Sequence, residues 1–130
     1  MSKSFTKDYS TVIIKHANPC GVALDKRKIN SYLKAYECDP TSAFGGIISC
    51  NYKVDKIVAK EISSKFYEVV VANGFESGAL KILKRKKNLR LIDSSSLKEL
   101  NFEQNTSIMN NFLSQSSDTK TFKKNDFKSH

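Results

Sequence analysis

The sequence predicts an α/β fold, and two observations on residues 11–93 lead to that prediction. Short apolar runs rich in β-branched residues, which are typical of buried strands, alternate with segments that have helical periodicity. Several of the intervening segments have ten or more residues, the length that a crossover between parallel strands needs. We therefore expect a mainly parallel sheet whose strands are linked by helices.

The first predicted strand covers residues 11–14 and ends near Lys15. A helix should follow it, because four apolar residues recur at the spacing of a single helical face. This helix should end before Pro40, since the residue that precedes a proline is disfavoured in the helical region. The residues of the apolar face are Ile29, Tyr32, Leu33 and Tyr36.

The next apolar run, residues 43–50, predicts a second strand that opens on two glycines. Asp55 has the character of an N-cap and predicts the start of a second helix. A third strand at residues 69–72, a third helix at about 76–87 and a fourth strand at 89–92 complete the alternation.

The pattern fades at residue 94, and residues 94–130 contain eight serines and five asparagines. We predict loops and one short helix there. The expected organisation is an α/β domain over residues 1–93 and a polar, loosely structured continuation of the same domain over residues 94–130.

Composition excludes several classes of protein. No apolar run approaches the roughly 18–20 residues of a membrane span, and the first residues lack the apolar stretch of a secretory signal. Three cysteines without a CxxC motif argue against a disulfide framework and a zinc cage, so we expect buried thiols in a cytoplasmic protein. No membrane partner is expected.

The net charge of +9 belongs to the patterned part of the chain, because residues 1–93 hold 17 basic and 9 acidic residues. This charge and the basic run at residues 84–87 motivate one alternative, a basic nucleic-acid-binding α/β module. The chain lacks the interleaved aromatic and basic residues of an RNA-binding strand motif. The basic run also suits the last turn of a helix, where cations complement the helix dipole.

Lys15 and His16 place an ammonium and an imidazole where a buried strand meets an Asn-Pro turn. Adjacent side chains on a regular strand point to opposite faces, so the pair can serve one site only if the backbone turns there. A histidine can act as a general base near neutral pH, and a lysine can stabilise an oxyanion. The competing interpretation is a solvated lysine beside a capping histidine.

Two further segments have candidate residues. Residues 39–46 include Ser42, Phe44 and Gly45, and glycines that open a strand let a ligand or another backbone approach closely. A tight turn between helix and strand explains the same glycines without a ligand. Glu68 stands at the edge of an apolar strand, as either a site carboxylate or a solvated loop residue.

Zinc deamination is testable because His16 lies close to Cys20. That chemistry needs H-x-E and P-C-x-x-C. The glutamate position holds Asn18 and the second cysteine position holds Ala23, so we reject a zinc deaminase.

The candidate segments also occur together and in order. KHANPCGVA at 15–23, AYECDPTSAFGGII at 35–48, FYEVVVA at 66–72 and NLRLI at 88–92 closely resemble the AICAR transformylase domain of the bifunctional purine biosynthesis enzymes. The resemblance covers residues 9–93 well and the tail to Phe127 loosely. It implies a three-layer α/β/α sandwich similar to cytidine deaminases but without zinc.

The resemblance also implies a reaction, the transfer of a formyl group from 10-formyltetrahydrofolate to the amine of the AICAR ribonucleotide. His16 and Lys15 correspond to the catalytic pair, and no metal is required. Four residues correspond to the AICAR pocket besides His16, and they are Ser42, Phe44, Gly45 and Glu68. The expected partners are AICAR, the folate and, for the full enzyme, a second copy in a homodimer; nucleic acid is not expected.

The chain departs from the family pattern in two ways. Asn73 stands where relatives usually have a proline, which changes a turn without touching the chemistry. More seriously, the family's upstream Arg-Tyr, its downstream Asn, Phe and Arg site residues, and the cyclohydrolase domain have no counterpart here. We therefore expect the N-terminal portion of a transformylase domain, a fragment that is inactive in isolation.

Overall fold

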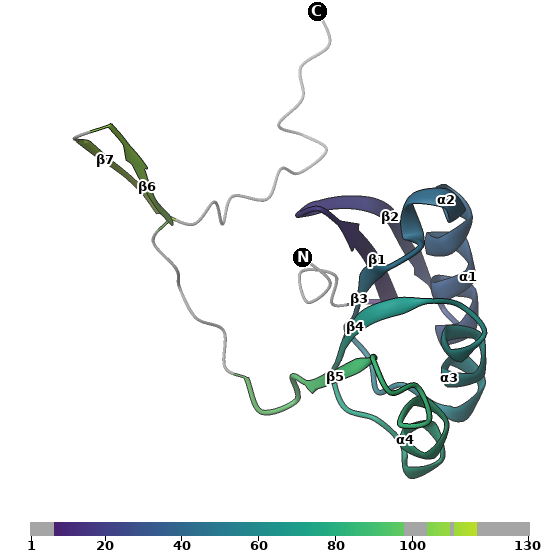
Figure 1. Cartoon of the computed structure of the whole chain (residues 1–130). Coiled ribbons are helices and arrows are strands. Elements are labelled where there is room, and N and C mark those ends of the chain that lie inside the picture. Colours follow the sequence, from purple (N-terminus) through teal and green to yellow (C-terminus); the bar gives the residue numbers. More distant parts are fainter. Residues whose placement is uncertain (1–6, 98–103, 110, 117–130) are drawn as a thin grey trace, which may run out of the picture. The chain divides into compact units, whose positions relative to one another are not determined.

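The structure is a computed structural model that describes residues 7–97, 104–109 and 111–116. The chain divides into two compact units, residues 1–97 and residues 98–130. The first unit contains a five-stranded sheet and the second a two-stranded one, and helices flank the larger sheet (Figure 1). The predicted α/β class is confirmed.

The sheet of the first unit has the strand order β2-β1-β3-β4-β5. Strands β3, β4 and β5 are parallel to one another, whereas β1 is antiparallel to both β2 and β3. The strands are β1 (Tyr9–Lys15), β2 (Asn18–Asp25), β3 (Gly46–Cys50), β4 (Tyr67–Ala72) and β5 (Arg90–Asp93).

The expectation of a mainly parallel sheet is therefore half right. The segment from Asn18 to Gly21 was predicted as a turn, but it opens strand β2. A strand that returns after two residues must lie antiparallel to the one before it. The parallel pairs are β3–β4 and β4–β5, whose connections contain the helices at residues 56–63 and 77–83.

The helices are α1 (Lys28–Cys38), α2 (Pro40–Ala43), α3 (Lys56–Ser63) and α4 (Ser77–Leu83). The predicted cap of α3 is confirmed, because Asp55 Oδ1 accepts hydrogen bonds from the backbone N–H groups of Ile57 (3.0 Å) and Val58 (2.9 Å). Helix α2 was not predicted. It is a single turn that Asp39 caps, and periodicity gives no signal for so short an element.

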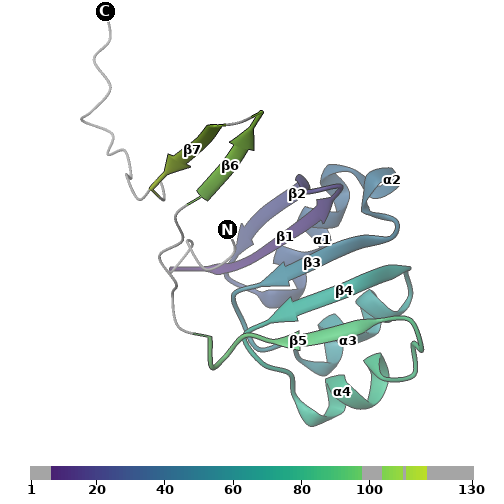
Figure 2. The same cartoon turned by 60° about the vertical axis from the view of Figure 1, so that its left-hand side comes forward.

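All four helices lie on one face of the sheet (Figures 1 and 2). The core between the helices and the sheet is apolar, and each buried aliphatic or aromatic side chain contributes about 1.5–3 kcal/mol. Its largest fully buried members include Ile13, Tyr32, Ile48, Ile62, Val70 and Leu83.

The opposite face of the sheet carries no helix within the described residues (Figure 2). Side chains alternate along a strand, so Ile47 points away from the helices when Ile48 points toward them. Apolar side chains on this second face are partly exposed; among them are Val22 and Leu24 of β2, Ile47 of β3 and Ile92 of β5.

Helix α1 is fixed on the sheet by close backbone contact and by a buried polar cluster. A β-carbon on Gly21 would lie 2.0 Å from the carbonyl oxygen of Ala35, so β2 and α1 approach this closely only with glycine there. Thr11 Oγ1 lies 2.7 Å from Ser31 Oγ and 2.8 Å from the Tyr52 hydroxyl. The hydroxyls satisfy one another in a site without water access.

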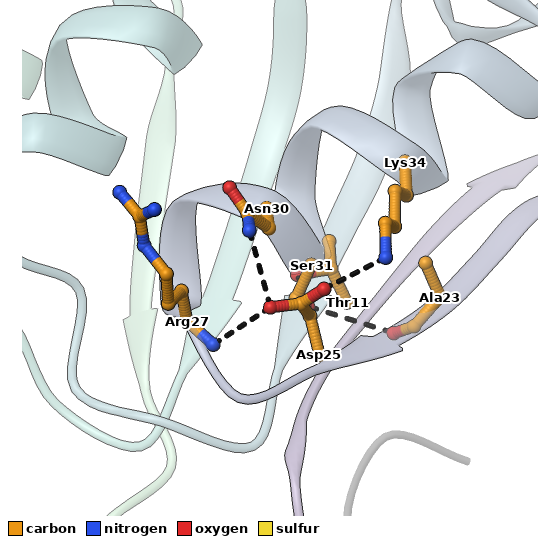
Figure 3. Close-up of polar contacts among 7 residues, drawn as sticks. All are labelled: Thr11, Ala23, Asp25, Arg27, Asn30, Ser31 and Lys34. Carbon is orange, nitrogen blue, oxygen red and sulfur yellow. Dashed lines mark hydrogen bonds and ion pairs between the residues drawn. The ribbon is translucent and has the colours of Figure 1, made fainter.

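Asp25 holds the start of α1 from outside the helix (Figure 3). Its carboxylate accepts hydrogen bonds from Lys34 Nζ (2.7 Å), the Arg27 backbone N–H (2.9 Å) and Asn30 Nδ2 (3.3 Å). The Lys34 bond, followed by the Arg27 N–H, lowers the pKa of Asp25. Arg27 is the N-cap residue and makes no capping bond through its side chain; Asp25 instead binds the Arg27 backbone N–H and two side chains of α1.

The second unit contains β6 (Gln104–Ile108) and β7 (Asn111–Gln115), which pair antiparallel from Gln104↔Gln115 to Ile108↔Asn111. The described residues of the tail thus form a β-hairpin, and the prediction of a short helix is wrong for them. The remainder of the tail, residues 98–103, 110 and 117–130, lies outside the described residues.

Two smaller findings concern the excluded classes. Of the three cysteines only Cys50 is buried; Cys20 is half-buried and Cys38 exposed, which corrects the prediction of buried thiols. In the described part of the chain, no helix is both long and apolar enough to cross a membrane.

Candidate functional site

The turn between β1 and β2 has an unusual backbone. Lys15 pairs with Asn18, and the two residues between them, His16 and Ala17, have positive φ values of 50° and 64°. Two-residue hairpin loops of this type prefer Asn-Gly, because a left-handed conformation costs other residues about 1–2 kcal/mol each. The chain therefore turns sharply at His16 and keeps local strain there, as functional sites often do.

The side chain of Lys15, the residue just before this turn, is held by two backbone carbonyls. Its Nζ donates to the carbonyl oxygens of Phe44 (2.8 Å) and Gly45 (3.2 Å). Gly45 has a φ of +67°, and a β-carbon on it would lie 2.9 Å from Lys15 Nζ. The positive φ favours glycine at this position, and any larger residue would also displace the flexible Lys15 side chain.

An exposed aromatic pair adjoins these contacts. The Gly45 backbone N–H donates to the Phe66 carbonyl oxygen at 2.9 Å. The rings of Phe44 and Phe66 are 5.1 Å apart between centroids and tilted by 40°. Phe44 is 67% exposed and Phe66 44% exposed, so the pair presents aromatic ring surface to solvent beside a lysine. Such a surface suits a planar ligand.

Ser42 is engaged by its own helix. Its backbone N–H donates to Asp39 Oδ1 at 2.9 Å and its hydroxyl donates to Asp39 Oδ2 at 2.6 Å. These bonds lower the pKa of the Asp39 carboxyl, the side-chain bond most. Because the Ser42 hydroxyl donates its hydrogen bond to Asp39, its oxygen can still accept a hydrogen bond from a ligand.

Glu68 is the extra residue of a β-bulge. Gly46 pairs with Tyr67 and Ile47 with Val69, so Glu68 falls between two paired residues of β4. Bulges reorient side chains and occur often next to active sites. Glu68 is exposed and lines a hollow of about 450 Å³ together with Phe66, Lys87, Asn88 and Arg90.

A second bulge lies in β2, where Pro19 pairs with Ile14 and Gly21 with Ile13, which makes Cys20 the extra residue. Burial is the largest cause of a raised pKa for the Cys20 thiol, and its Sγ donates to the Ile13 carbonyl oxygen at 3.5 Å. We therefore expect a protonated thiol that packs against the core, with no role as a nucleophile.

These residues gather at one edge of the sheet. Lys15 ends β1, and because β1 runs antiparallel to β3, this end lies beside the start of β3 at Gly46. The candidate site therefore adjoins the carboxyl end of β1 but the amino ends of the parallel strands. Lys15 does lie at the carboxyl end of β1, as the sequence predicts, whereas the other candidates lie at the amino ends of the parallel strands.

The structure brings Lys15, Phe44 and Gly45 into direct contact, with His16 next in the chain and Glu68 two residues beyond Phe66. Sequence reasoning missed Phe66, which adjoins both Phe44 and the Gly45 position, as well as Asn88 and Arg90. The sequence signal that could have identified Phe66 is its position, an apolar residue between a predicted helix and a predicted strand. No sequence pattern marks Asn88 or Arg90 as a site residue.

Two further hollows adjoin Phe66. One of about 420 Å³ is lined mainly by aromatic residues and lysines, and a smaller one of about 130 Å³ lies beside it. Within the described residues no three His, Cys, Asp or Glu side chains form a group that could hold a metal ion.

Comparison with known proteins decides the family. The family model of the AICARFT/IMPCHase bienzyme matches residues 1–130, the whole chain. The chain belongs to this family.

Three curated relatives, each called a bifunctional purine biosynthesis protein PurH, illustrate the match. The Clostridium kluyveri protein is 50% identical over 109 residues, which cover 84% of this chain and 22% of the relative. The Prochlorococcus marinus protein is 43% identical over 129 residues, 98% of this chain and 25% of the relative. The Acetivibrio thermocellus protein is 53% identical over 83 residues, 64% of this chain and 16% of the relative. The chain thus spans between a sixth and a quarter of the length of these relatives.

One solved structure with a similar fold is Acinetobacter baumannii RibD, form 1. It superposes with a TM-score of 0.56 at 15% identity and covers 70% of this chain and 30% of that one. At this identity the similarity concerns the fold alone.

Proposed function

We propose that this chain contributes to the formyl-transfer site of an AICAR transformylase. The reaction moves a formyl group from 10-formyltetrahydrofolate to the 5-amino group of the AICAR ribonucleotide, during synthesis of the purine nucleotide IMP. The parent enzyme would also have IMP cyclohydrolase activity in another domain. Family membership supports the proposal, and so does the local geometry.

One observation carries the proposal: Lys15 is fixed by the carbonyls of Phe44 and Gly45 at 2.8 and 3.2 Å, directly beside the strained residue His16. An ammonium with three protons that donates two of them to fixed carbonyls keeps the third for a ligand. His16 is exposed at the two-residue turn that joins β1 and β2. A catalytic pair explains both features.

The proposed chemistry assigns one role to each member of the pair. The AICAR amine attacks the formyl carbon, and the resulting tetrahedral intermediate places negative charge on the formyl oxygen. Lys15 stabilises that oxygen and His16 accepts a proton from the attacking nitrogen. The bond from carbon to N10 of the folate then breaks, the electron pair returns to N10, and N10 takes up a proton. General base catalysis of this type contributes about 10²–10⁴-fold to the rate.

The remaining candidates would bind the nucleotide. Glu68, which the bulge reorients, would accept hydrogen bonds from AICAR, and Gly45 would contact it through its backbone. Phe44 supplies a ring face and Ser42 an acceptor oxygen. Asn88 and Arg90 share the hollow of Glu68, so they join the proposed set.

The finer fold is also part of the proposal. We infer a three-layer sandwich of the cytidine-deaminase type without zinc, in which a further layer of the same enzyme covers the second face of the sheet. The run Val69-Val70-Val71 supports this, because strands buried on both faces read as continuous apolar runs. The full enzyme would act without a metal, as a cytoplasmic homodimer.

Binding and turnover test the proposal separately. In amide NMR spectra of the 130-residue chain, added AICAR should shift Gly45 and Glu68 saturably, and Glu68→Gln should weaken this binding about tenfold, since a hydrogen bond to a charged group contributes about 1.5–3 kcal/mol. Lys53→Gln, a change at an exposed lysine outside the site, is the control. The proposal fails if AICAR produces no saturable shift, or if both variants bind it equally.

We expect no turnover from the 130-residue chain, because the family's other site residues have no counterpart in it. An isotope-labelled formyl-transfer assay would measure this. Turnover that His16→Ala abolishes would refute the expected inactivity while supporting the assigned role. The comparisons do not support the nucleic-acid-binding alternative, which predicts RNA binding that weakens steeply with salt.

A further inference from the structure

Asp39 lies at the junction of two helices, close to the proposed site but outside the set of residues assigned to it. It ends α1 and is also the N-cap residue of α2. Because a proline follows, helical backbone is disfavoured at Asp39, which has φ −159° and ψ 85°, and the chain changes direction there. Its carboxylate therefore stands at the start of the short turn that leads to Phe44 and Gly45.

Helix α2 depends on Asp39 more than a longer helix depends on its cap. It has four residues, and an isolated helix of that length does not form in water. Of these residues only Ala43 is buried, so packing contributes little. The Asp39 carboxylate accepts from the backbone N–H (2.9 Å) and the hydroxyl (2.6 Å) of Ser42, and its carbonyl oxygen accepts from the Ala43 N–H at 3.1 Å. The bonds that close the turn thus converge on Asp39.

The other end of this turn carries the two carbonyls that hold Lys15. The Phe44 N–H donates to the Thr41 carbonyl oxygen at 3.4 Å, which ties Phe44 to the turn. The carbonyl oxygens of Phe44 and Gly45 then accept from Lys15 Nζ. On its other side the peptide between these residues is anchored by the Gly45 N–H, which donates to the Phe66 carbonyl oxygen. The position of the ammonium therefore depends on the turn as well as on that anchor.

Asp39 does not act on Lys15 as a counter-ion. Among the described residues no carboxylate forms an ion pair with Lys15, and both carboxylate oxygens of Asp39 accept from Ser42. A carboxylate in direct contact would offset the positive charge that an oxyanion needs. Neutral carbonyls fix the ammonium and leave this charge available. The influence of Asp39 on Lys15 therefore passes through the backbone.

We propose that Asp39 is a positioning residue for formyl transfer, because through the turn of α2 it fixes the two carbonyls that hold Lys15. This inference rests on the proposed function, which makes Lys15 the group that stabilises the formyl oxygen. The competing interpretation is a cap that stabilises the fold alone. It predicts that Asp39 and Asp55, the side-chain cap of α3, affect Lys15 alike.

The experiment follows the Lys15 ammonium in the 130-residue chain by heteronuclear NMR, which measures how fast its protons exchange with water. Hydrogen bonds to the two carbonyls slow this exchange. We expect Asp39→Ala to accelerate it about tenfold, which corresponds to the loss of about one hydrogen bond. Asp55→Ala is the matched control, because it also removes a side-chain cap but from a helix that does not lead to these carbonyls. It should lower stability and leave the Lys15 exchange unchanged.

A conservative variant tests the route through the cap. Asp39→Asn should keep the slow exchange of the Lys15 ammonium, because an amide oxygen caps a helix about as well as a carboxylate does. Equal acceleration by the alanine and asparagine variants would overturn the inference, since the charge and not the cap would then act. If Asp39→Ala unfolds the chain, Asp39→Gly makes the same comparison, because glycine is tolerated at an N-cap and has no side-chain oxygen.

The remaining outcomes separate this inference from the proposed function. Unchanged exchange at Lys15 in the alanine variant of Asp39, or equal acceleration by Asp55→Ala, would overturn the positioning role. AICAR shifts at Gly45 and Glu68 in the parent chain report on the proposed function alone. If those shifts are missing while the Lys15 ammonium responds to Asp39→Ala, the proposed function fails and the link from Asp39 to Lys15 stands.

Discussion

Gly45 offers the sharpest test of how the candidate site is built. Replacing it with alanine forces an L-residue into a φ of +67° and brings a methyl group to 2.9 Å from Lys15 Nζ and 3.4 Å from Phe66 Cε1. Contacts of 2.9 Å are too short, so the flexible Lys15 side chain must move. Its two hydrogen bonds to the Phe44 and Gly45 carbonyls would then break.

The expected magnitude follows from three contributions. The left-handed conformation costs alanine about 1–2 kcal/mol. The lost lysine hydrogen bonds cost about 1 kcal/mol in total, since Lys15 regains water. The less flexible unfolded chain of an alanine variant returns about 0.4–1 kcal/mol. We therefore expect Gly45→Ala to lower the free energy of unfolding by about 1–2.5 kcal/mol.

Urea unfolding followed by circular dichroism measures this change, and Gly78→Ala is the matched control. Gly78 lies in α4, and a β-carbon there would make only ordinary contacts of 3.7–3.8 Å with the Lys56 side chain. Alanine in a helix should stabilise the chain by about 0.5–1 kcal/mol. Equal stability of Gly45→Ala and the parent chain, with AICAR shifts unchanged, would refute the argument that Gly45 positions Lys15.

Four other predictions concern the turn, the buried cluster, one carboxylate and one cap. Ala17→Gly should raise the free energy of unfolding by about 0.5–1 kcal/mol, because glycine relieves the left-handed strain at φ 64° while His16 stays in place; a loss of stability would show that the turn is not strained. Thr11→Val should cost about 1–3 kcal/mol in the same assay, since it removes a hydroxyl that contacts both Ser31 and Tyr52, and a neutral result would contradict the buried cluster. Lys34 lowers the pKa of Asp25 in the folded state, so the Asp25–Lys34 pair stabilises the fold above the ordinary pKa of 3.8, and this stabilisation is lost as pH falls through the lowered pKa. When the free energy of unfolding is measured from pH 6 to 2, Lys34→Met should lose less stability in acid than the parent chain does. Identical profiles would reject the pairing. Asp55→Ala should cost about 1 kcal/mol through the lost cap of α3, whereas Lys56→Ala, one position later and exposed, should change stability by less.

The elements with a strong period could be predicted from the sequence. Helix α1 ends at Cys38, as Pro40 requires, and Asp55 caps α3 because a short acceptor stands just before an apolar helical face. Strand β4 was recognisable from its apolar run. Each of these signals depends on a few neighbouring residues, and here the local preference agrees with the tertiary structure.

Strand β2 and the two bulges were beyond local reasoning. Asn18-Pro19-Cys20-Gly21 has turn composition, but pairing with β1 and the close approach of α1 to Gly21 make it a strand. Tertiary contacts outweighed turn propensity there. The site was predictable where one motif holds neighbouring residues, as at Lys15 and His16. Phe66 and Asn88 lie just before β4 and β5, and Arg90 opens β5, so only the folded sheet brings them to that edge.

The bulge at Glu68 has a consequence for engineering the fold apart from its site. Tyr67 and Val69 already pair with the consecutive residues Gly46 and Ile47, so the ladder of hydrogen bonds has no need of the residue between them. Deleting Glu68 would join two paired positions and leave the register of β4 with β3 intact. A substitution at this position changes one carboxylate, whereas the deletion removes the departure from regular pairing that turns it outward. The sheet can thus lose Glu68 by the loss of a single codon and regain it by the gain of one, with the register of β3 and β4 unchanged.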